Sequence, residues 1–317
     1  MGFAKKNPAL GAILFNIIFG FAYLPLKVLT AELEGNTPHL LSFRFGVCFL
    51  SLWLLGKLGV VRLRKIRVLL PMAVPLCLML LLSSFFETFC LLYYPMGKAS
   101  VILALVPLFS TLFAVFFFRE KTGPVQIVFI LLAFFGVAVI NSGSQDQEAT
   151  FYGFVLAMIA AVATALLNIT IRKSSSDMNV WETSYTMAFA VAVVYTVIAL
   201  TGFASTGNIA GYFAPLANWK VISGIFFLSV ISSLYGNSLR NVVMSHMPMA
   251  KASSFTGICT VTSIVLGIVL LGEKFEVQYV IGSALVLAGV LGVNLCQSSG
   301  SKAAPTETKE EIINECK

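Results

Sequence analysis

Two opposite charges inside apolar stretches are the side chains of this chain best suited to chemistry. Glu87 lies in the apolar stretch 68–93, and Arg240 lies in the apolar stretch 219–244. A charge left unpaired at the centre of a bilayer costs at least about 2.5–3.5 kcal/mol, so we expect both side chains to face the interior of a helix bundle. There they could bind a charged solute and handle a proton, or form a structural ion pair that fixes helix packing.

The spacing of the two charges is the period of an internal repeat. The chain reads Pro-Met-Gly-Lys-Ala-Ser from Pro95 and Pro-Met-Ala-Lys-Ala-Ser from Pro248, a shift of 248 − 95 = 153 residues, and each charge lies eight residues before its proline. Without a gap, the same shift aligns further pairs: Glu120-Lys121 with Glu273-Lys274, Gly136-Val137 with Gly289-Val290, and Asn141 with Asn294. Two corresponding halves in a membrane chain are typical of a secondary transporter that binds its solute between them.

The composition is that of an integral membrane protein. Hydrophobic residues make up 58% of the 317 residues and charged residues 11%, whereas soluble proteins carry about 25% charged residues. The net charge of +7 is spread over short loops, so we expect no nucleic-acid partner. Five of the six cysteines lie in apolar segments, and no CxxC pair, HExxH, GxSxG or phosphate-binding loop occurs. We therefore expect no metal, no cofactor and no enzymatic activity.

Ten apolar segments are long enough to cross a hydrocarbon core of roughly 30 Å as helices. They lie at about residues 8–29, 38–57, 68–93, 97–118, 124–142, 151–171, 181–203, 219–244, 249–271 and 276–297. The first segment is longer than the apolar part of a signal peptide and contains Pro25 and Lys27, so we expect it to be retained as a helix. The short loops leave no separate soluble domain, and the polar tail is expected to be disordered.

Lysine and arginine lie mostly on one side of these segments, which predicts the topology. The basic residues on the side of the N-terminus are Lys5, Lys6, Lys57, Arg62, Arg64, Lys65, Arg67, Arg119, Lys121, Arg172, Lys173 and Lys251, together with those of the tail. The opposite loops hold only Lys98, Lys220 and Lys274. Basic loops stay inside, so we expect a multi-pass protein of the cell membrane with both termini cytoplasmic.

Five helices in each half mean that the second half enters the membrane the other way up. The predicted fold class is therefore all-α and integral to the membrane, with ten transmembrane helices as two inverted five-helix repeats. The expected divisions are a first repeat at 1–142, a second, inverted repeat at 151–297, and a disordered cytoplasmic tail at 298–317.

These features resemble the drug/metabolite transporter superfamily, specifically its EamA-type permeases. The resemblance covers nearly the whole chain outside the tail. The motifs that carry it are Phe19-Gly20-Phe21 with Lys27, Ala99-Ser100, Pro107-Leu108-Phe109, Glu120-Lys121 and Gly136-Val137-Ala138-Val139-Ile140. The family has a Trp-Gly pair where this chain has Phe19-Gly20. The resemblance implies alternating access of a central cavity lined mainly by helices 1, 3, 4, 6, 8 and 9, with export of small metabolites or amino acids a frequent activity.

Polar residues at membrane depth define the candidate substrate site. The expected substrate-binding residues are Glu87, Arg240, Asn237, Asn241, Asn168, Asn16, Ser84 and Thr260. Those on the eighth segment recur at three- and four-residue spacing, which places them on one face of a helix. Lys27 and Arg44 lie closer to the outer ends of their segments, so they either face the bundle or extend to lipid headgroups.

The residues together favour a secondary transporter that moves a small polar metabolite or an amino acid by alternating access, outward and coupled to protons. If Glu87 and Arg240 bond to each other in the empty carrier, a zwitterion could replace that one bond with two. The alternatives are an uptake or exchange permease for a larger metabolite such as S-adenosylmethionine or a nucleoside, a lipid-linked substrate flippase, and a membrane enzyme. The expected partners are a small-molecule substrate, with a proton as a further possibility, and the lipid bilayer, and we expect either a monomer or a homodimer.

Overall fold

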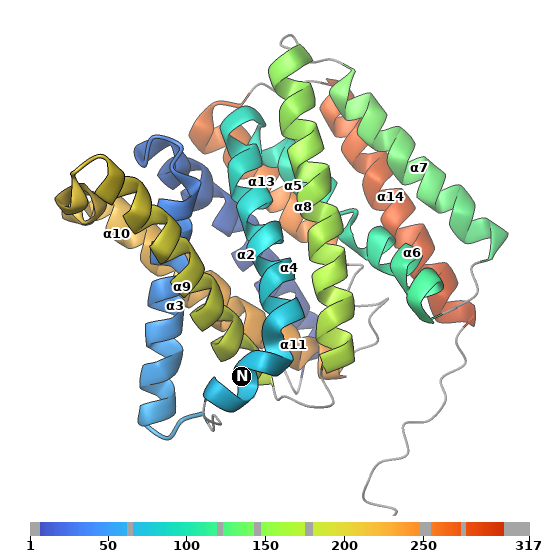
Figure 1. The fold of residues 1–317 in the computed structure, drawn as a ribbon. Coiled ribbons are helices and arrows are strands. Elements are labelled where there is room, and N and C mark those ends of the chain that lie inside the picture. The colour runs from blue at the N-terminus through green and yellow to red at the C-terminus, as the bar shows by residue number, and fades with distance from the viewer. Residues whose placement is uncertain are drawn as a thin grey trace, which may run out of the picture.

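The computed structural model describes an all-helical chain, and every regular element in the described residues is a helix (Figure 1). The described residues are 7–61, 66–118, 123–142, 147–174, 180–246, 255–273 and 277–300.

The helices follow the predicted apolar segments closely. Their bounds are α2 (Pro8–Glu32), α3 (Thr37–Lys57), α4 (Ile66–Tyr93), α5 (Met96–Leu103), α6 (Val106–Phe118), α7 (Pro124–Asn141), α8 (Gln147–Ser174), α9 (Val180–Ser205), η1 (Ile209–Tyr212), η2 (Ala214–Ala217), α10 (Trp219–Phe226), η3 (Phe227–Gly236), α11 (Asn237–His246), α13 (Thr256–Leu271) and α14 (Val277–Gly300). Seven spans are long and apolar enough to cross a membrane, and three shorter apolar helices accompany them in the part of the chain that is described. The count of ten crossings stays a prediction.

Local sequence sets where several helices begin. Asn36 precedes α3, and its side chain accepts a hydrogen bond from His39 N at 3.2 Å. Asn218 caps α10 in the same way, accepting from Lys220 N at 3.0 Å. Pro124 opens α7, where a missing N–H costs nothing because the first helical N–H groups have no partner within the helix. These caps fix the ends of the helices and therefore the depth at which their polar residues lie.

The fourth segment is broken in the middle, between α5 and α6. Pro107 lacks an N–H and its ring collides with the carbonyl four residues earlier, so the helix cannot continue unchanged past Leu103. The chain makes a tighter turn there, in which Leu105 N donates to Ile102 O at 2.9 Å. The second half has Thr260 at the equivalent position, and α13 runs unbroken through it.

The eighth segment contains a π-helix, η3, between α10 and α11. A π-turn holds one more residue than an α-turn, which rotates the following residues relative to the preceding ones, and such turns occur often at functional sites. Ser232 and Ser233 lie within η3, and Asn237 and Arg240 lie in α11, which continues the same helix.

The two halves pack with a two-fold relation that follows the 153-residue shift. At one edge of the molecule α7 lies beside α14, and α3 packs against α9 (Figure 1). Likewise α2 packs against the α10–η3–α11 helix and α13, while α8 packs against α4 and the α5–α6 pair. Each of these contacts therefore has a counterpart when the halves are exchanged.

Glycines at the α7–α14 contact show this relation at atomic detail. A methyl group on Gly136 would lie 2.7 Å from Gly282 O and 2.8 Å from Val286 N. One on Gly289 would lie 2.6 Å from Phe129 O and 2.8 Å from Ala133 N. These two sets of contacts are equivalent under the repeat: Gly289 is Gly136 shifted by 153 residues, and Phe129 and Ala133 are Gly282 and Val286 shifted back by 153. The two helices therefore run antiparallel across a local two-fold axis.

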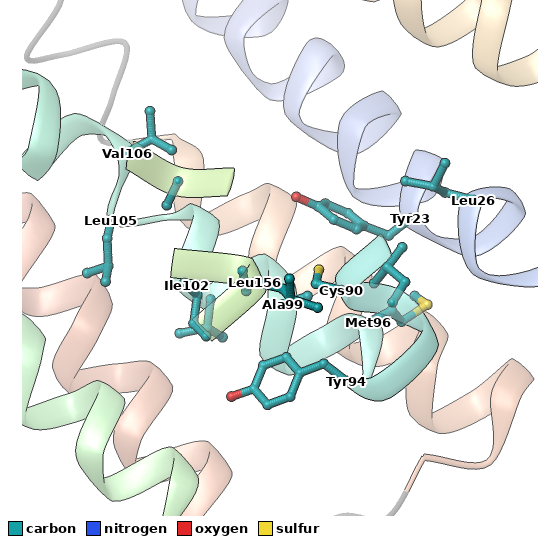
Figure 2. Close-up of a cluster of buried hydrophobic side chains, with 14 of the residues drawn as sticks. Tyr23, Leu26, Cys90, Tyr94, Met96, Ala99, Ile102, Leu105, Val106 and Leu156 are labelled. Carbon is teal, nitrogen blue, oxygen red and sulfur yellow. The ribbon is translucent and has the colours of Figure 1, made fainter. Parts of the chain in front are cut away.

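A buried apolar cluster fills the bundle where α2, α4 and α5 meet, around Tyr23, Leu26, Cys90, Met96 and Ala99 (Figure 2). It packs the three helices against one another beside the turns that join α2 to α3 and α4 to α5.

Two charged side chains form hydrogen bonds with backbone groups at this same end of the bundle. Lys27 Nζ donates to Leu91 O and, at 3.2 Å, to Tyr94 O, the free carbonyls at the end of α4. Glu273 Oε1 accepts from Met96 N at 2.6 Å and Oε2 accepts from Gly97 N at 3.3 Å, so the carboxylate caps α5. The predicted topology places this end outside the cell. The twin of Glu273, Glu120, lies outside the described residues.

Candidate functional site

A cavity of about 320 Å³ lies in the middle of the bundle. Residues of both halves line it, from α2, α3, α4, the α5–α6 pair, α8, the α10–η3–α11 helix and α13. Its charged and strongly polar lining residues are Asn16, Tyr23, Arg44, Glu87, Asn168, Asn237 and Arg240. This volume falls at the lower end of the range for small-molecule sites, about 300–1,000 Å³.

Glu87 supplies the only carboxylate in the described lining of this cavity. The hydroxyl of Tyr23 on α2 and the guanidinium of Arg44 on α3 both lie close enough to interact with it. The acid therefore lies near a neutral hydroxyl and a cation from two other helices of its own half.

Arg44 lies inside the bundle and does not extend to the lipid headgroups, so the lipid alternative considered from the sequence is wrong for this residue. Its Nε donates to Ser233 Oγ at 3.4 Å, across the boundary between the halves, and its guanidinium lies 5.5 Å from the centre of the Phe45 ring. Its Nη1 is enclosed by protein and has no hydrogen-bond partner in the structure. Lys27 also turns inward, to the carbonyls at the end of α4.

Arg240 lines the cavity from the second half. Its Nη2 donates to Asn168 Oδ1 at 3.0 Å, which joins α11 to α8. The structure records no ion pair between Glu87 and Arg240, although both lie in the described part of the chain. The ion pair that the sequence left open is therefore not formed: Arg240 bonds to Asn168, and Glu87 lies near Tyr23 and Arg44.

Two further asparagines lie where the sequence predicts, in the cavity lining. Asn16 Nδ2 donates to Ala12 O at 2.8 Å, and Asn237 Nδ2 donates to Ser233 O at 2.8 Å. Each side chain is fixed by one N–H that donates to a carbonyl of its own helix, and its amide oxygen can accept a hydrogen bond from another partner.

Two of the expected site residues, Ser84 and Thr260, are not brought to the cavity in the described part of the chain. Ser84 Oγ donates to Leu80 O at 2.6 Å and lies beside the hydroxyl of Tyr195, while its neighbour Ser83 lines the cavity instead. Thr260 is 1% exposed and is absent from the lining, to which α13 contributes Thr256 and Cys259. Successive helical residues differ by about 100° around the axis, so a one-residue error selects the wrong face. The side chain of Asn241 lies outside the described residues.

Sequence reasoning missed Tyr23 and Arg44 as site residues. Tyr23 follows Asn16 by seven residues on α2, a spacing that returns to the same helix face and could have indicated it. Arg44 is the eighth residue of the 21-residue helix α3, nearer its middle than its end, and the start of α3 is set by the Asn36 cap. Counting depth from that cap would have placed Arg44 inside the membrane.

The cavity therefore offers one carboxylate, two guanidiniums and neutral amide and hydroxyl groups. In the described part of the chain no group of three or more His, Cys, Asp or Glu side chains could hold a metal ion. Fixed charges of both signs around a small enclosed space can bind a charged small molecule from two sides, with its polar groups matched to the opposing charges.

Comparisons with known proteins agree with a transport role. A profile of the EamA-like transporter family matches residues 7–142 and 151–295. The uncharacterized transporter YcxC of Bacillus subtilis (strain 168) is 29% identical over 300 residues, covering 92% of this chain and 94% of that protein. A probable amino-acid metabolite efflux pump of Escherichia coli (strain K12) is 21% identical over 296 residues, covering 90% and 94%.

Two further proteins are similar to this chain. A probable terminal-alkyne amino-acid exporter of Streptantibioticus cattleyicolor is 27% identical over 206 residues, covering 64% of this chain and 65% of that protein. A crystal structure of another protein superposes with a TM-score of 0.58 at 17% identity, covering 89% of this chain and 98% of the other, which shows a shared fold. Because the family profile matches both halves in turn, this chain belongs to the EamA-like transporter family and is a multi-pass membrane transporter, not an enzyme.

Proposed function

We propose that this transporter exports a small amphoteric metabolite of the amino-acid class by alternating access, in exchange for protons. The observation that carries the proposal is the central cavity, which presents a carboxylate and guanidiniums from the two halves in a volume of about 320 Å³. The printed names of the distant relatives from Escherichia coli and Streptantibioticus cattleyicolor, an amino-acid metabolite efflux pump and an amino-acid exporter, support the same substrate class and direction.

The charges of the cavity match those of an amino acid. The carboxylate of the solute meets the guanidinium of Arg240, which Asn168 holds in place, and its ammonium group meets Glu87. Hydrogen bonds between charged partners are about twice as strong as neutral ones, so each end of the solute offsets the cost of leaving water. Because Glu87 and Arg240 are not bonded to each other, the solute has no ion pair to break before it binds.

Alternating access requires a closure on each side of the cavity. The contacts of Lys27 and Glu273 form one such closure, at the end of the bundle that the predicted topology places outside the cell. There Lys27 holds the end of α4 and Glu273 holds the start of α5. The Lys27 bonds join α2 to α4 within the first half, whereas the Glu273 bonds join the second half to α5 of the first half. In the proposed inverted topology, rocking of one half against the other would break the Glu273 bonds and close the opposite end.

Exchange with protons follows from the single carboxylate. Glu87 can be neutralised either by a proton or by the ammonium group of the solute, and one occupant excludes the other. A carrier that reorients only when this carboxylate is neutralised would therefore move solute one way and a proton the other. The small volume of the cavity favours an amino acid over S-adenosylmethionine or a lipid-linked substrate.

Counterflow in vesicles tests this function directly. Vesicles that contain purified protein and unlabelled amino acids should accumulate a labelled amino acid from outside, and Arg240→Ala should abolish the accumulation. Glu87→Gln should keep counterflow, which needs no net proton movement, but should lose the response to an imposed pH gradient. Glu32→Gln, at an exposed position on the end of α2, is the control and should behave as the parent.

Two results would contradict the proposal. Amino-acid transport by Arg240→Ala at the parent rate would show that this guanidinium only supports helix packing. A pH response that persists in Glu87→Gln would exclude this carboxylate as the proton carrier.

A further inference from the structure

The charged lining of the cavity is not balanced. Among the described residues that line it, Arg44 and Arg240 are cationic and Glu87 alone is anionic, which leaves one positive charge in excess. An arginine side chain does not lose its proton in proteins, so the excess cannot be removed by titration of either guanidinium.

Neither guanidinium forms an ion pair in the structure. Arg240 donates to the neutral amide oxygen of Asn168, and Arg44 donates to the neutral hydroxyl of Ser233. Arg44 in addition has Nη1 enclosed without any partner. A buried donor without an acceptor is unfavourable, and the cost disappears when an acceptor arrives. Arg44 therefore has hydrogen-bonding capacity that the protein itself does not use.

The two guanidiniums approach the cavity from different walls. Arg44 comes from α3 in the first half, and Arg240 comes from α11 in the second, where it is joined to α8. Glu87, on α4, lies near Arg44 and the hydroxyl of Tyr23. A solute with one carboxylate can engage only one of the two guanidiniums, and a net-neutral solute leaves the excess positive charge of the cavity unopposed.

We propose that Arg44 is a second anion-binding residue of this cavity, and that the preferred solute carries two anionic groups and one ammonium group, with a net charge of −1. One anionic group meets Arg44, the other meets Arg240, and the ammonium group meets Glu87, so that every charge in the cavity has an opposite partner. This is the chemistry of an acidic amino acid. The inference rests on the proposed transport of amphoteric metabolites and narrows it to one charge class.

Glutamate and glutamine test the inference, because they have nearly the same shape and differ by one charge. In counterflow with purified protein, unlabelled glutamate should compete at least about tenfold more strongly than glutamine, the effect of one charge-assisted hydrogen bond. Arg44→Gln should remove this difference by weakening competition by glutamate, while competition by glutamine stays at the parent level. Lys57→Gln removes one exposed positive charge from the same helix and should leave the preference intact.

A second variant separates binding from folding. Arg44→Lys keeps the charge but loses the planar fork, so it should retain a reduced preference for glutamate even if Arg44→Gln does not fold. Equal competition by glutamate and glutamine in the parent protein would overturn the inference and leave the proposed function standing. An unchanged glutamate preference in folded Arg44→Gln would also overturn it. Failure of the folded parent to transport any amino acid would instead reject the proposed function.

Discussion

Adding one methyl group at the α7–α14 contact should destabilise the protein, and by the same amount from either half. The variants are Gly136→Ala and its repeat partner Gly289→Ala. In each case the new carbon would lie 2.6–2.8 Å from backbone atoms of the facing helix. Backbone atoms cannot rotate away as side-chain ends can, so α7 and α14 must separate.

The size of the effect follows from two opposing contributions. Alanine in place of glycine inside a helix gains up to about 1 kcal/mol through its helix propensity. Overpacking at a close contact costs typically about 1–3 kcal/mol. Gly46, inside α3, has nothing within 4 Å of the position of an added methyl group, so Gly46→Ala shows the gain alone. Each contact variant should therefore be less stable than the Gly46→Ala control by about 1–3 kcal/mol.

Thermal unfolding of purified protein in detergent measures this difference. A dye that becomes fluorescent on reacting with thiols reports unfolding, because Cys48, Cys77 and Cys90 are buried in the folded protein. Gly136→Ala and Gly289→Ala should lower the unfolding temperature relative to the control and should agree with each other. If Gly136→Ala is as stable as Gly46→Ala, the helices do not approach as closely as described. If only one twin is destabilised, the two-fold relation is wrong.

Three further predictions concern the closed end, the acid and the topology. Glu273→Ala removes two hydrogen bonds from the start of α5 and should destabilise the closed end by about 2–4 kcal/mol, since the 2.6 Å bond to the charged group contributes about 1.5–3 kcal/mol and the longer 3.3 Å bond contributes less. Faster labelling of a buried cysteine measures the effect. Tyr23→Phe removes a polar hydroxyl from the cavity lining beside Glu87 and should lower solute affinity in counterflow while folding is kept. In a cysteine-free background, Thr206→Cys should react with a membrane-impermeant thiol reagent on intact cells and Val60→Cys should not, because the predicted topology places them on opposite sides.

Each of these has its own control and its own contradictory result. Glu273→Gln keeps an acceptor without the charge and should fall between parent and alanine variant; equal behaviour of all three would mean that the cap contributes nothing. Unaltered affinity in Tyr23→Phe would separate this hydroxyl from solute binding. Permeabilised cells should label both new cysteines, and labelling of Val60→Cys on intact cells would reverse the topology.

The sequence predicts those parts of the fold in which a local pattern of residues is compatible with a single structure. Long apolar segments indicate helices, and the capping residue Asn36 and Pro124 mark where two of them begin. The 153-residue repeat is visible because equivalent positions meet equivalent contacts, as Gly136 and Gly289 do. The break in the fourth segment is not predicted, since 97–118 is expected as one helix, although Pro107 is the local signal for it because its ring cannot be accommodated in a continuous helix.

The site was less predictable because it depends on rotation about each helix. The π-helix η3 has no sequence signal of its own, and it alters which faces of the eighth segment meet the cavity. Ser84 is expected at the site, but its neighbour Ser83 lines the cavity, and one residue along a helix turns a side chain by about 100°. The surroundings of a charge also depend on the distance between helices, which no single segment encodes, so the different surroundings of Glu87 and Arg240 appear only in the structure.

The cap that Glu273 places on α5 also has a consequence for how the protein is made. The acceptor is 177 residues further along the chain than Met96 N, the group that it caps. At a synthesis rate of about 5–20 residues per second, the start of α5 waits about 9–35 s for its partner to leave the ribosome. During that time the first half has a short helix in the membrane with unpaired N–H groups, an unfavourable state in lipid. The first half therefore cannot complete its own structure during synthesis, and a truncated chain that stops before Glu273 should be cleared by membrane quality control even when all of its own helices have been inserted.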